Sequence, residues 1–173
     1  MRNPQQSLIL AIDGHDGAGK TTLAGLLAEK LGGVYVRPFG GATGTSLITQ
    51  AEQHHYQEVS RIGLMAIRDA AAQHDARVLV FDRHWMTVFT LIPAAYRDEW
   101  FPLPATTLCY AGMPATLLRL GERDEAIFDR AYHEGYMQQY YDLAHQYGAH
   151  ILRTDQHDVA QCLDMLVQWA TNL

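Results

Sequence analysis

The sequence predicts an α/β fold: a single doubly wound domain with a mostly parallel, five-stranded sheet and helices on both faces. Short apolar stretches alternate along the chain with segments of helical periodicity, which is typical of this class. Several of the apolar stretches lack the polar alternation of a half-exposed strand, as expected for strands that are buried on both faces. The 173 residues, 48% of them hydrophobic, suffice for one core of this kind. We therefore treat residues 1–173 as one domain.

The individual elements follow from local patterns. Leucines at positions 23, 26, 27 and 31 recur at helical spacing, and two glycines at 32 and 33 end that helix. A proline at position 114 fits the first turn of a short helix that ends near residue 121. The remaining predicted helices cover residues 57–73, 127–147 and 159–170. The predicted strands are residues 8–12, 34–36, 78–81, 106–110 and 150–153.

Composition narrows the class of protein. Thirteen basic and nineteen acidic side chains leave a net charge of −6, which argues against a nucleic-acid partner. Two cysteines cannot form a disulfide framework, and this favours a reducing, cytoplasmic location. The first seven residues contain no apolar stretch of signal-peptide length, and no apolar run is long enough to span a membrane.

A phosphate-binding motif lies between the first predicted strand and the first predicted helix. Residues 14–21 match the pattern G-x-x-x-x-G-K-[ST] in full. Glycines let backbone amides approach a triphosphate closely, and the following helix directs its positive end at the anion. Lys20 is expected to contact the β and γ phosphates, and the Thr21 hydroxyl to hold Mg²⁺. The predicted ATP site comprises Gly14, His15, Asp16, Gly17, Ala18, Gly19, Lys20, Thr21 and Thr22.

Four further charged residues are candidates for catalysis. Asp82 and Arg83 follow the third predicted strand, so they lie at the sheet edge where ligands bind in open α/β sheets. Asp82 is expected to hold the metal with Thr21 or to accept a proton, and Arg83 to meet a phosphate. Arg119 and Arg123 flank Gly121 and predict a short lid around residues 119–127. The alternatives are an ordinary capping aspartate and solvated arginines.

Three segments together resemble the thymidylate kinase family. They are residues 11–22 (A-I-D-G-H-D-G-A-G-K-T-T), residues 36–43 (V-R-P-F-G-G-A-T) and residues 78–84 (V-L-V-F-D-R-H). The resemblance implies the nucleoside monophosphate kinase variant of the P-loop NTPase fold, ATP–Mg²⁺ as donor, a pyrimidine deoxynucleotide as acceptor and a homodimer. It also implies that Asp16 faces the acceptor sugar, that Arg37 and Arg83 meet its phosphate, and that Arg61 reaches the same pocket. The aromatic character of Phe39 suggests stacking on a base.

Departures from the family pattern leave the acceptor open. Pro38-Phe39 replaces the usual Glu-Pro, and residues 85–90 (W-M-T-V-F-T) contain no glutamine to contact a base. A pyrimidine deoxynucleoside monophosphate is the first choice, and a deoxynucleoside or modified nucleotide is the alternative within the kinases. A P-loop ATP-binding protein or ATPase without a small-molecule acceptor is the alternative outside them.

Tyrosines also recur every four residues at 132, 136 and 140. This spacing predicts packing in the core or between subunits, or a place beside a bound base.

Overall fold

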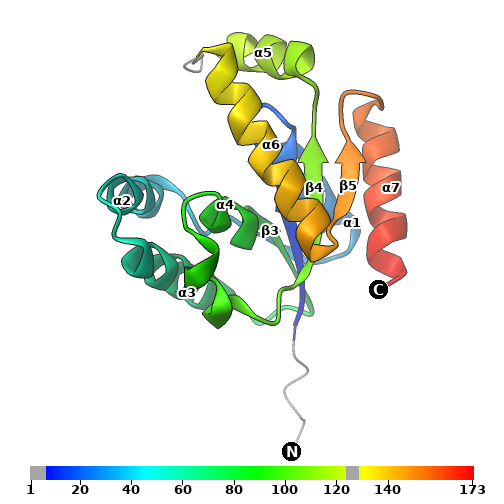
Figure 1. Ribbon diagram of the computed structural model, residues 1–173. Coiled ribbons are helices and arrows are strands. Elements are labelled where there is room, and N and C mark those ends of the chain that lie inside the picture. Colours follow the sequence, from blue (N-terminus) through cyan, green and yellow to red (C-terminus); the bar gives the residue numbers. More distant parts are fainter. Residues whose placement is uncertain (1–6, 124–128) are drawn as a thin grey trace, which may run out of the picture.

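The computed structural model describes residues 7–123 and 129–173 of the chain. In this part, five strands form one sheet in the order β2-β3-β1-β4-β5 (Figure 1). Every neighbouring pair is parallel. The prediction of an α/β fold with a mostly parallel sheet is confirmed, and each predicted strand is found within one residue of its expected bounds. The strands are β1 (Leu8–Asp13), β2 (Val34–Val36), β3 (Val78–Asp82), β4 (Ala105–Tyr110) and β5 (His150–Arg153).

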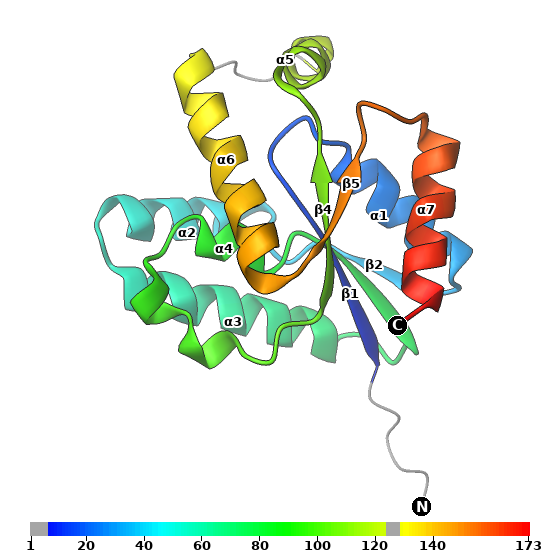
Figure 2. The same ribbon diagram turned by 45° about the vertical axis from the view of Figure 1, so that its right-hand side comes forward.

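Helices cover both faces of this sheet (Figures 1 and 2). On one face lie α1 (Lys20–Lys30) and α7 (Val159–Thr171). On the other lie α3 (Tyr56–Ala72), the short α4 (Trp85–Phe89) and α6 (Arg130–Tyr147), with α2 (Gly41–Glu52) packed on α3. The helix α5 (Met113–Glu122) follows the carboxyl end of β4. Two short 3₁₀ turns, Ala94–Tyr96 and Asp98–Trp100, precede β4.

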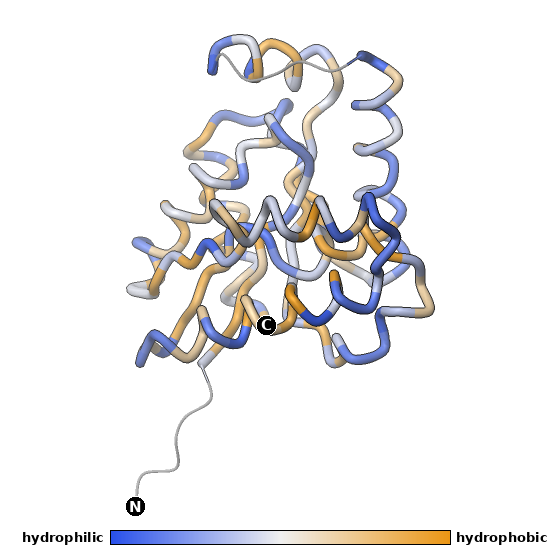
Figure 3. Tube along the Cα trace, turned by 90° about the vertical axis from the view of Figure 1, so that its left-hand side faces the viewer, coloured by the Kyte–Doolittle hydropathy of each residue, from blue (hydrophilic) through white to orange (hydrophobic). Residues whose placement is uncertain are grey.

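Two apolar cores hold these layers together. The α1/α7 face buries Leu10 and Val80 of the sheet against Leu27 and Leu166. The opposite core contains Phe81, Trp85 and Phe89 with side chains of α3 and α6. Hydrophobic stretches therefore run along the central strands (Figure 3). Among the described residues, no helix has the length and apolar composition that a bilayer span requires.

Three helices differ from the sequence-based expectation. One is the short α4, for which the sequence analysis predicted no helix. Helix α2 was not anticipated, because its small polar residues carry little helical periodicity and two glycines precede them. It begins after Gly40 and is anchored by Leu47, whose side chain is buried in the core on the α3 face of the sheet. Helix α6 begins at Arg130, where the Asp129 carboxylate accepts a hydrogen bond from the Tyr132 amide at 2.8 Å. The expected start at residue 127 lies outside the described residues.

Candidate active site

The phosphate-binding loop connects β1 to α1 and has the backbone that its glycines require. Gly14, Gly17 and Gly19 all have positive φ angles, of 145°, 76° and 86°. A Cβ on Gly14 would lie 2.3 Å from the Cys109 carbonyl oxygen, and a Cβ on Gly17 would lie 3.0 Å from the Thr116 carbonyl oxygen. Side chains at these positions would force the loop away from β4 and α5. The loop is thus packed tightly against the carboxyl end of the sheet.

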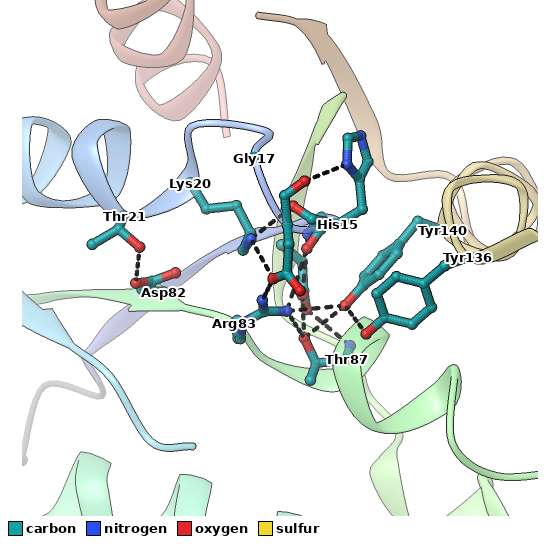
Figure 4. Close-up of polar contacts among 12 residues, drawn as sticks. His15, Gly17, Lys20, Thr21, Asp82, Arg83, Thr87, Tyr136 and Tyr140 are labelled. Carbon is teal, nitrogen blue, oxygen red and sulfur yellow. Dashed lines mark hydrogen bonds and ion pairs between the residues drawn. The ribbon is translucent and has the colours of Figure 1, made fainter. Parts of the chain in front are cut away.

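Lys20 opens α1 and turns back over the loop (Figure 4). Its Nζ donates a hydrogen bond to the His15 carbonyl oxygen at 2.8 Å and lies 3.9 Å from Asp16 Oδ1. Burial, together with the nearby Arg83 charge, lowers the pKa of the Lys20 ammonium to about 8. The ammonium is therefore held inside the phosphate-binding loop, where it could contact a bound triphosphate.

His15 fixes the loop to the neighbouring strand. Its Nε2 accepts a hydrogen bond from the Ala111 amide at 3.3 Å, so its Nδ1 carries the proton and donates to the Asp16 carbonyl oxygen at 2.9 Å. The ring also meets Tyr110 edge-on. Burial lowers the pKa of His15 to about 4, so the imidazole is neutral at physiological pH. The sequence analysis included His15 in the predicted ATP site but assigned it no contact of its own.

Asp13, at the end of β1, connects the loop to the turn after β3. This fully buried carboxylate accepts hydrogen bonds from the His84 amide at 2.8 Å, the Thr87 hydroxyl at 2.7 Å and the Gly14 amide at 3.2 Å. The sequence analysis did not identify Asp13. Asp13 could have been found from its position directly after a buried apolar strand, because a carboxylate buried there without partners would be energetically costly.

Thr21 and Asp82, the two residues predicted to hold a metal ion, are in direct contact. The Thr21 hydroxyl donates to Asp82 Oδ2 at 2.8 Å, and the Tyr35 hydroxyl donates to the same oxygen at 2.7 Å. The second oxygen, Asp82 Oδ1, is buried and has no hydrogen-bond partner among the described residues. A hydroxyl and a carboxylate with a free oxygen are ligands that suit Mg²⁺, which usually takes one or two protein oxygens together with nucleotide phosphates. These residues therefore fit the expected ion.

Arg83 lies between the loop and α6. Its Nη2 pairs with Asp16 Oδ1, and its Nη1 lies 3.2 Å from the Tyr140 hydroxyl and 3.4 Å from the Gly14 carbonyl oxygen (Figure 4). The Thr87 hydroxyl contacts the Tyr140 hydroxyl at 3.0 Å and so joins this group to Asp13. Burial by itself would raise the pKa of Asp16, but the Arg83 and Lys20 charges bring it below its usual value. Asp16 is therefore an ionised carboxylate between two cations.

The tyrosines of α6 differ in their surroundings. Tyr140 is fully buried beside Arg83, whereas Tyr132 is half exposed and stacks on Tyr136. The Tyr136 hydroxyl lies 3.5 Å from that of Tyr140. Tyr140 therefore meets the expectation of core packing, and the partly buried Tyr136 packs against the same core.

Arg119, on α5, donates hydrogen bonds that hold the phosphate-binding loop in place. Its Nη1 donates to the Gly17 carbonyl oxygen at 3.0 Å, and its Nη2 donates to the Thr154 carbonyl oxygen at 2.8 Å. The Thr154 hydroxyl in turn donates to the Ala18 carbonyl oxygen at 2.8 Å. The guanidinium expected in a lid thus contacts the backbone of the loop. Arg123 directly follows α5, and residues 124–127 of the expected lid lie outside the described residues.

A cavity of about 410 Å³ opens beside the loop, toward α7. Gly19 and Thr22 line its side next to the phosphate-binding loop, and Arg119 and Arg123 contribute cationic groups. Leu23, Val159 and Cys162 supply apolar walls. This volume and mixed lining are typical of small-molecule sites.

The other predicted acceptor residues are not gathered around Arg83. Arg37 is exposed just after β2, at the same edge of the sheet as Asp82. Phe39 is buried in the core on the α3 face. Arg61 lies on α3, where its Nε donates to Glu58 at 2.7 Å, and it lines a different cavity with Tyr96. The structure therefore brings together Asp16, Lys20, Thr21, Asp82 and Arg83.

The loop, the Thr21–Asp82 contact and the parallel sheet define a P-loop NTPase fold. No protein-family model matches the chain. The chain is 33% identical over 119 residues to the thymidylate kinase of Xanthomonas euvesicatoria pv. vesicatoria (strain 85-10), an alignment that covers 62% of the chain and 46% of that protein. The chain therefore spans less than half the length of this curated relative.

Solved structures show the same fold. The structure of deoxyadenosine kinase from M. mycoides with bound dATP superposes with a TM-score of 0.64 at 14% identity, over 95% of this chain and all of the other. The structure of the same kinase with products dCMP and dCDP superposes with a TM-score of 0.61 at 15% identity, over 96% of this chain and all of the other. The predicted fold and the predicted resemblance to thymidylate kinase-like P-loop kinases are confirmed.

Proposed function

We propose that the protein is an ATP-dependent kinase that phosphorylates a nucleoside or nucleotide, with a pyrimidine deoxynucleoside monophosphate as the first candidate acceptor. The observation that carries the proposal is the gathering of Lys20, the Thr21–Asp82 pair and the Asp16–Arg83 pair at one sheet edge. Phosphoryl transfer depends mainly on positioning and on positive charge around the transferred group. The similarity to a thymidylate kinase supports the same activity.

The donor nucleotide would use the phosphate-binding loop and the cavity beside it. Amides of the loop and of the first turn of α1 would hold the triphosphate, and Lys20 would move from the His15 carbonyl oxygen to the β and γ phosphates. The 410 Å³ cavity adjoins Gly19 and Thr22, so it is placed to take the nucleoside of ATP. Arg119 would keep the loop in its binding conformation through Gly17.

Thr21 and Asp82 would hold Mg²⁺, which when bound supplies charge neutralisation on the β and γ phosphates. Thr21 keeps a lone pair for the ion while it donates to Asp82 Oδ2. The unpartnered Asp82 Oδ1 is available to the ion or to one of its water ligands.

The acceptor would bind on the α6 side of the loop. Asp16 would accept a hydrogen bond from the acceptor sugar, and Arg83 would exchange part of its contact with Asp16 for the acceptor phosphate. Arg37, exposed at the same edge, is placed to add charge as the acceptor enters. We do not extend the proposal to Phe39 and Arg61, because the first lies in the core and the second lines another cavity.

An acceptor screen tests this function. ATP and Mg²⁺ are supplied with thymidine, dTMP, dUMP, dCMP or a modified pyrimidine nucleotide, and ADP and the phosphorylated product are quantified by chromatography. We expect ADP formation that depends on one acceptor class, with an equal amount of phosphorylated acceptor. Lys20→Met serves as the inactive control. Slow ATP hydrolysis that no acceptor accelerates would contradict the proposal and indicate an ATPase.

We further propose a cytoplasmic location and a homodimer. Cys109 and Cys162 are free and buried, which suits a reducing compartment. The dimer rests on the family resemblance. Cell fractionation and light scattering coupled to size-exclusion chromatography test the two points.

A further inference from the structure

Tyr35 contacts the carboxylate that is expected to hold the metal. Its hydroxyl lies 2.7 Å from Asp82 Oδ2 and must donate, because an ionised carboxylate only accepts hydrogen bonds. The Thr21 hydroxyl donates to the same oxygen from α1, at 2.8 Å. Tyr35 belongs to β2, at the edge of the sheet next to β3, and its ring packs against the core on the α1/α7 face. Asp82 is thus held by hydroxyls from two different elements.

The two oxygens of this carboxylate have different environments. Oδ2 receives both hydroxyl donors, whereas Oδ1 is buried and has no partner among the described residues. A buried carboxylate oxygen without a partner is costly unless a ligand completes it. A single hydrogen bond from Thr21 would leave Asp82 free to rotate about that contact. The second donor, from the rigid sheet, removes this freedom.

We propose that Tyr35 is a positioning residue of the metal site: its hydroxyl fixes the Asp82 carboxylate so that Oδ1 stays available to Mg²⁺ or to its water ligands. This inference rests on the proposed function. Hydrogen bonds from outside the ligand set orient metal ligands in many proteins, and their removal typically weakens metal binding tenfold to a hundredfold. Tyr35 remains a donor throughout the physiological range, because burial and the Asp82 contact raise its pKa to about 12.

A merely structural role for Tyr35 has different consequences. The Tyr35 hydroxyl would then stabilise the fold through one hydrogen bond, and Tyr35→Phe would affect nucleotide binding equally with and without metal. The proposed role affects only the part of nucleotide affinity that the metal supplies. The ratio of the nucleotide affinity with metal to the affinity without metal therefore separates the two alternatives.

The test compares Tyr35→Phe with the wild type. Affinity for the non-hydrolysable ATP analogue adenylyl imidodiphosphate is measured by calorimetry in Mg²⁺ and again in EDTA, and Mn²⁺ in the ternary complex is observed by electron paramagnetic resonance. We expect the enhancement of affinity by Mg²⁺ to fall about tenfold in Tyr35→Phe. The affinity in EDTA should stay unchanged, and the Mn²⁺ spectrum should change. Tyr96→Phe is the matched control, because Tyr96 is 40% exposed and packs on Tyr56, on the α3 side of the molecule.

A double-mutant cycle with Asp82→Asn adds a readout that does not depend on overall stability. We expect Tyr35→Phe to have no further effect on the Mg²⁺ enhancement once Asp82 is changed. An unchanged enhancement and an unchanged Mn²⁺ spectrum in Tyr35→Phe, beside a wild type that binds the analogue with Mg²⁺, would overturn the role of Tyr35 alone. A wild type that binds no adenine nucleotide under either condition would instead overturn the proposed function, and the inference with it.

Discussion

The buried ammonium of Lys20 makes nucleotide affinity depend on pH in an unusual range. Burial and the Arg83 charge place its pKa at about 8 in the free protein. Bound phosphates favour the charged form, so the bound state keeps its proton to higher pH. Above pH 8 the free protein has lost this proton and must regain it in order to bind. Affinity for ATP should therefore fall by roughly twentyfold between pH 7.5 and pH 9.5.

Calorimetry of ATP binding in two buffers with different ionisation enthalpies measures the effect. At pH 9 we expect uptake of close to one proton for each ATP bound, and at pH 7.5 uptake of about a quarter of a proton. Lys20→Met should bind weakly, with little dependence on pH across this range. Equal affinities at pH 7.5 and pH 9.5, without proton uptake by the wild type, would refute the assignment of a lowered pKa to Lys20.

Three further predictions concern the supports of the site. Arg119→Met removes the brace on the Gly17 carbonyl oxygen, and should lower the free energy of unfolding in urea by about 2 kcal/mol and weaken ATP binding in the same assay; unchanged ATP affinity would contradict the brace. His84 is buried with its pKa lowered to about 3, so the unfolded chain takes up its proton first as pH falls below 6.5. From pH 7 to pH 5 the wild type should therefore lose about 2 kcal/mol more stability in urea than His84→Leu, and parallel curves would count against this assignment. Gly14→Ala places a Cβ 2.3 Å from the Cys109 carbonyl oxygen and should cost at least about 3 kcal/mol in thermal or urea unfolding, whereas Gly25→Ala, with no atom within 4 Å, should not destabilise the fold.

The parts of the fold that sequence predicted are those that chemistry constrains most strongly. A strand buried on both faces of a sheet must be apolar, so β1 and β3 were visible as apolar runs. The phosphate-binding loop was visible because close approach of its backbone to an anion requires glycines at fixed spacing. The Thr21–Asp82 contact followed from the position of both residues at one edge of a parallel sheet.

The parts that sequence did not predict depend on contacts between distant segments. Helix α2 is stabilised by packing on α3 through Leu47, and its own residues carry no strong helical pattern. Arg119 was recognisable as a charged residue near a glycine, but its partner Gly17 lies 102 positions away in the sequence. The Tyr35 hydroxyl likewise meets Asp82 only because β2 pairs with β3. The sequence shows that polar side chains such as Arg119 and Tyr35 are present, but only the folded structure shows which groups they contact.

Amide chemical shifts on addition of Mg²⁺–ATP test the central claim most directly, since that claim is that loop amides and one ammonium group hold the nucleotide. In spectra of the ¹⁵N-labelled protein, we predict that the largest shifts fall on residues 14–22, with smaller shifts at Thr154 and Val159 beside the adjoining cavity. Shifts centred on the distant cavity near Tyr96, or no shifts at millimolar nucleotide, would contradict the account.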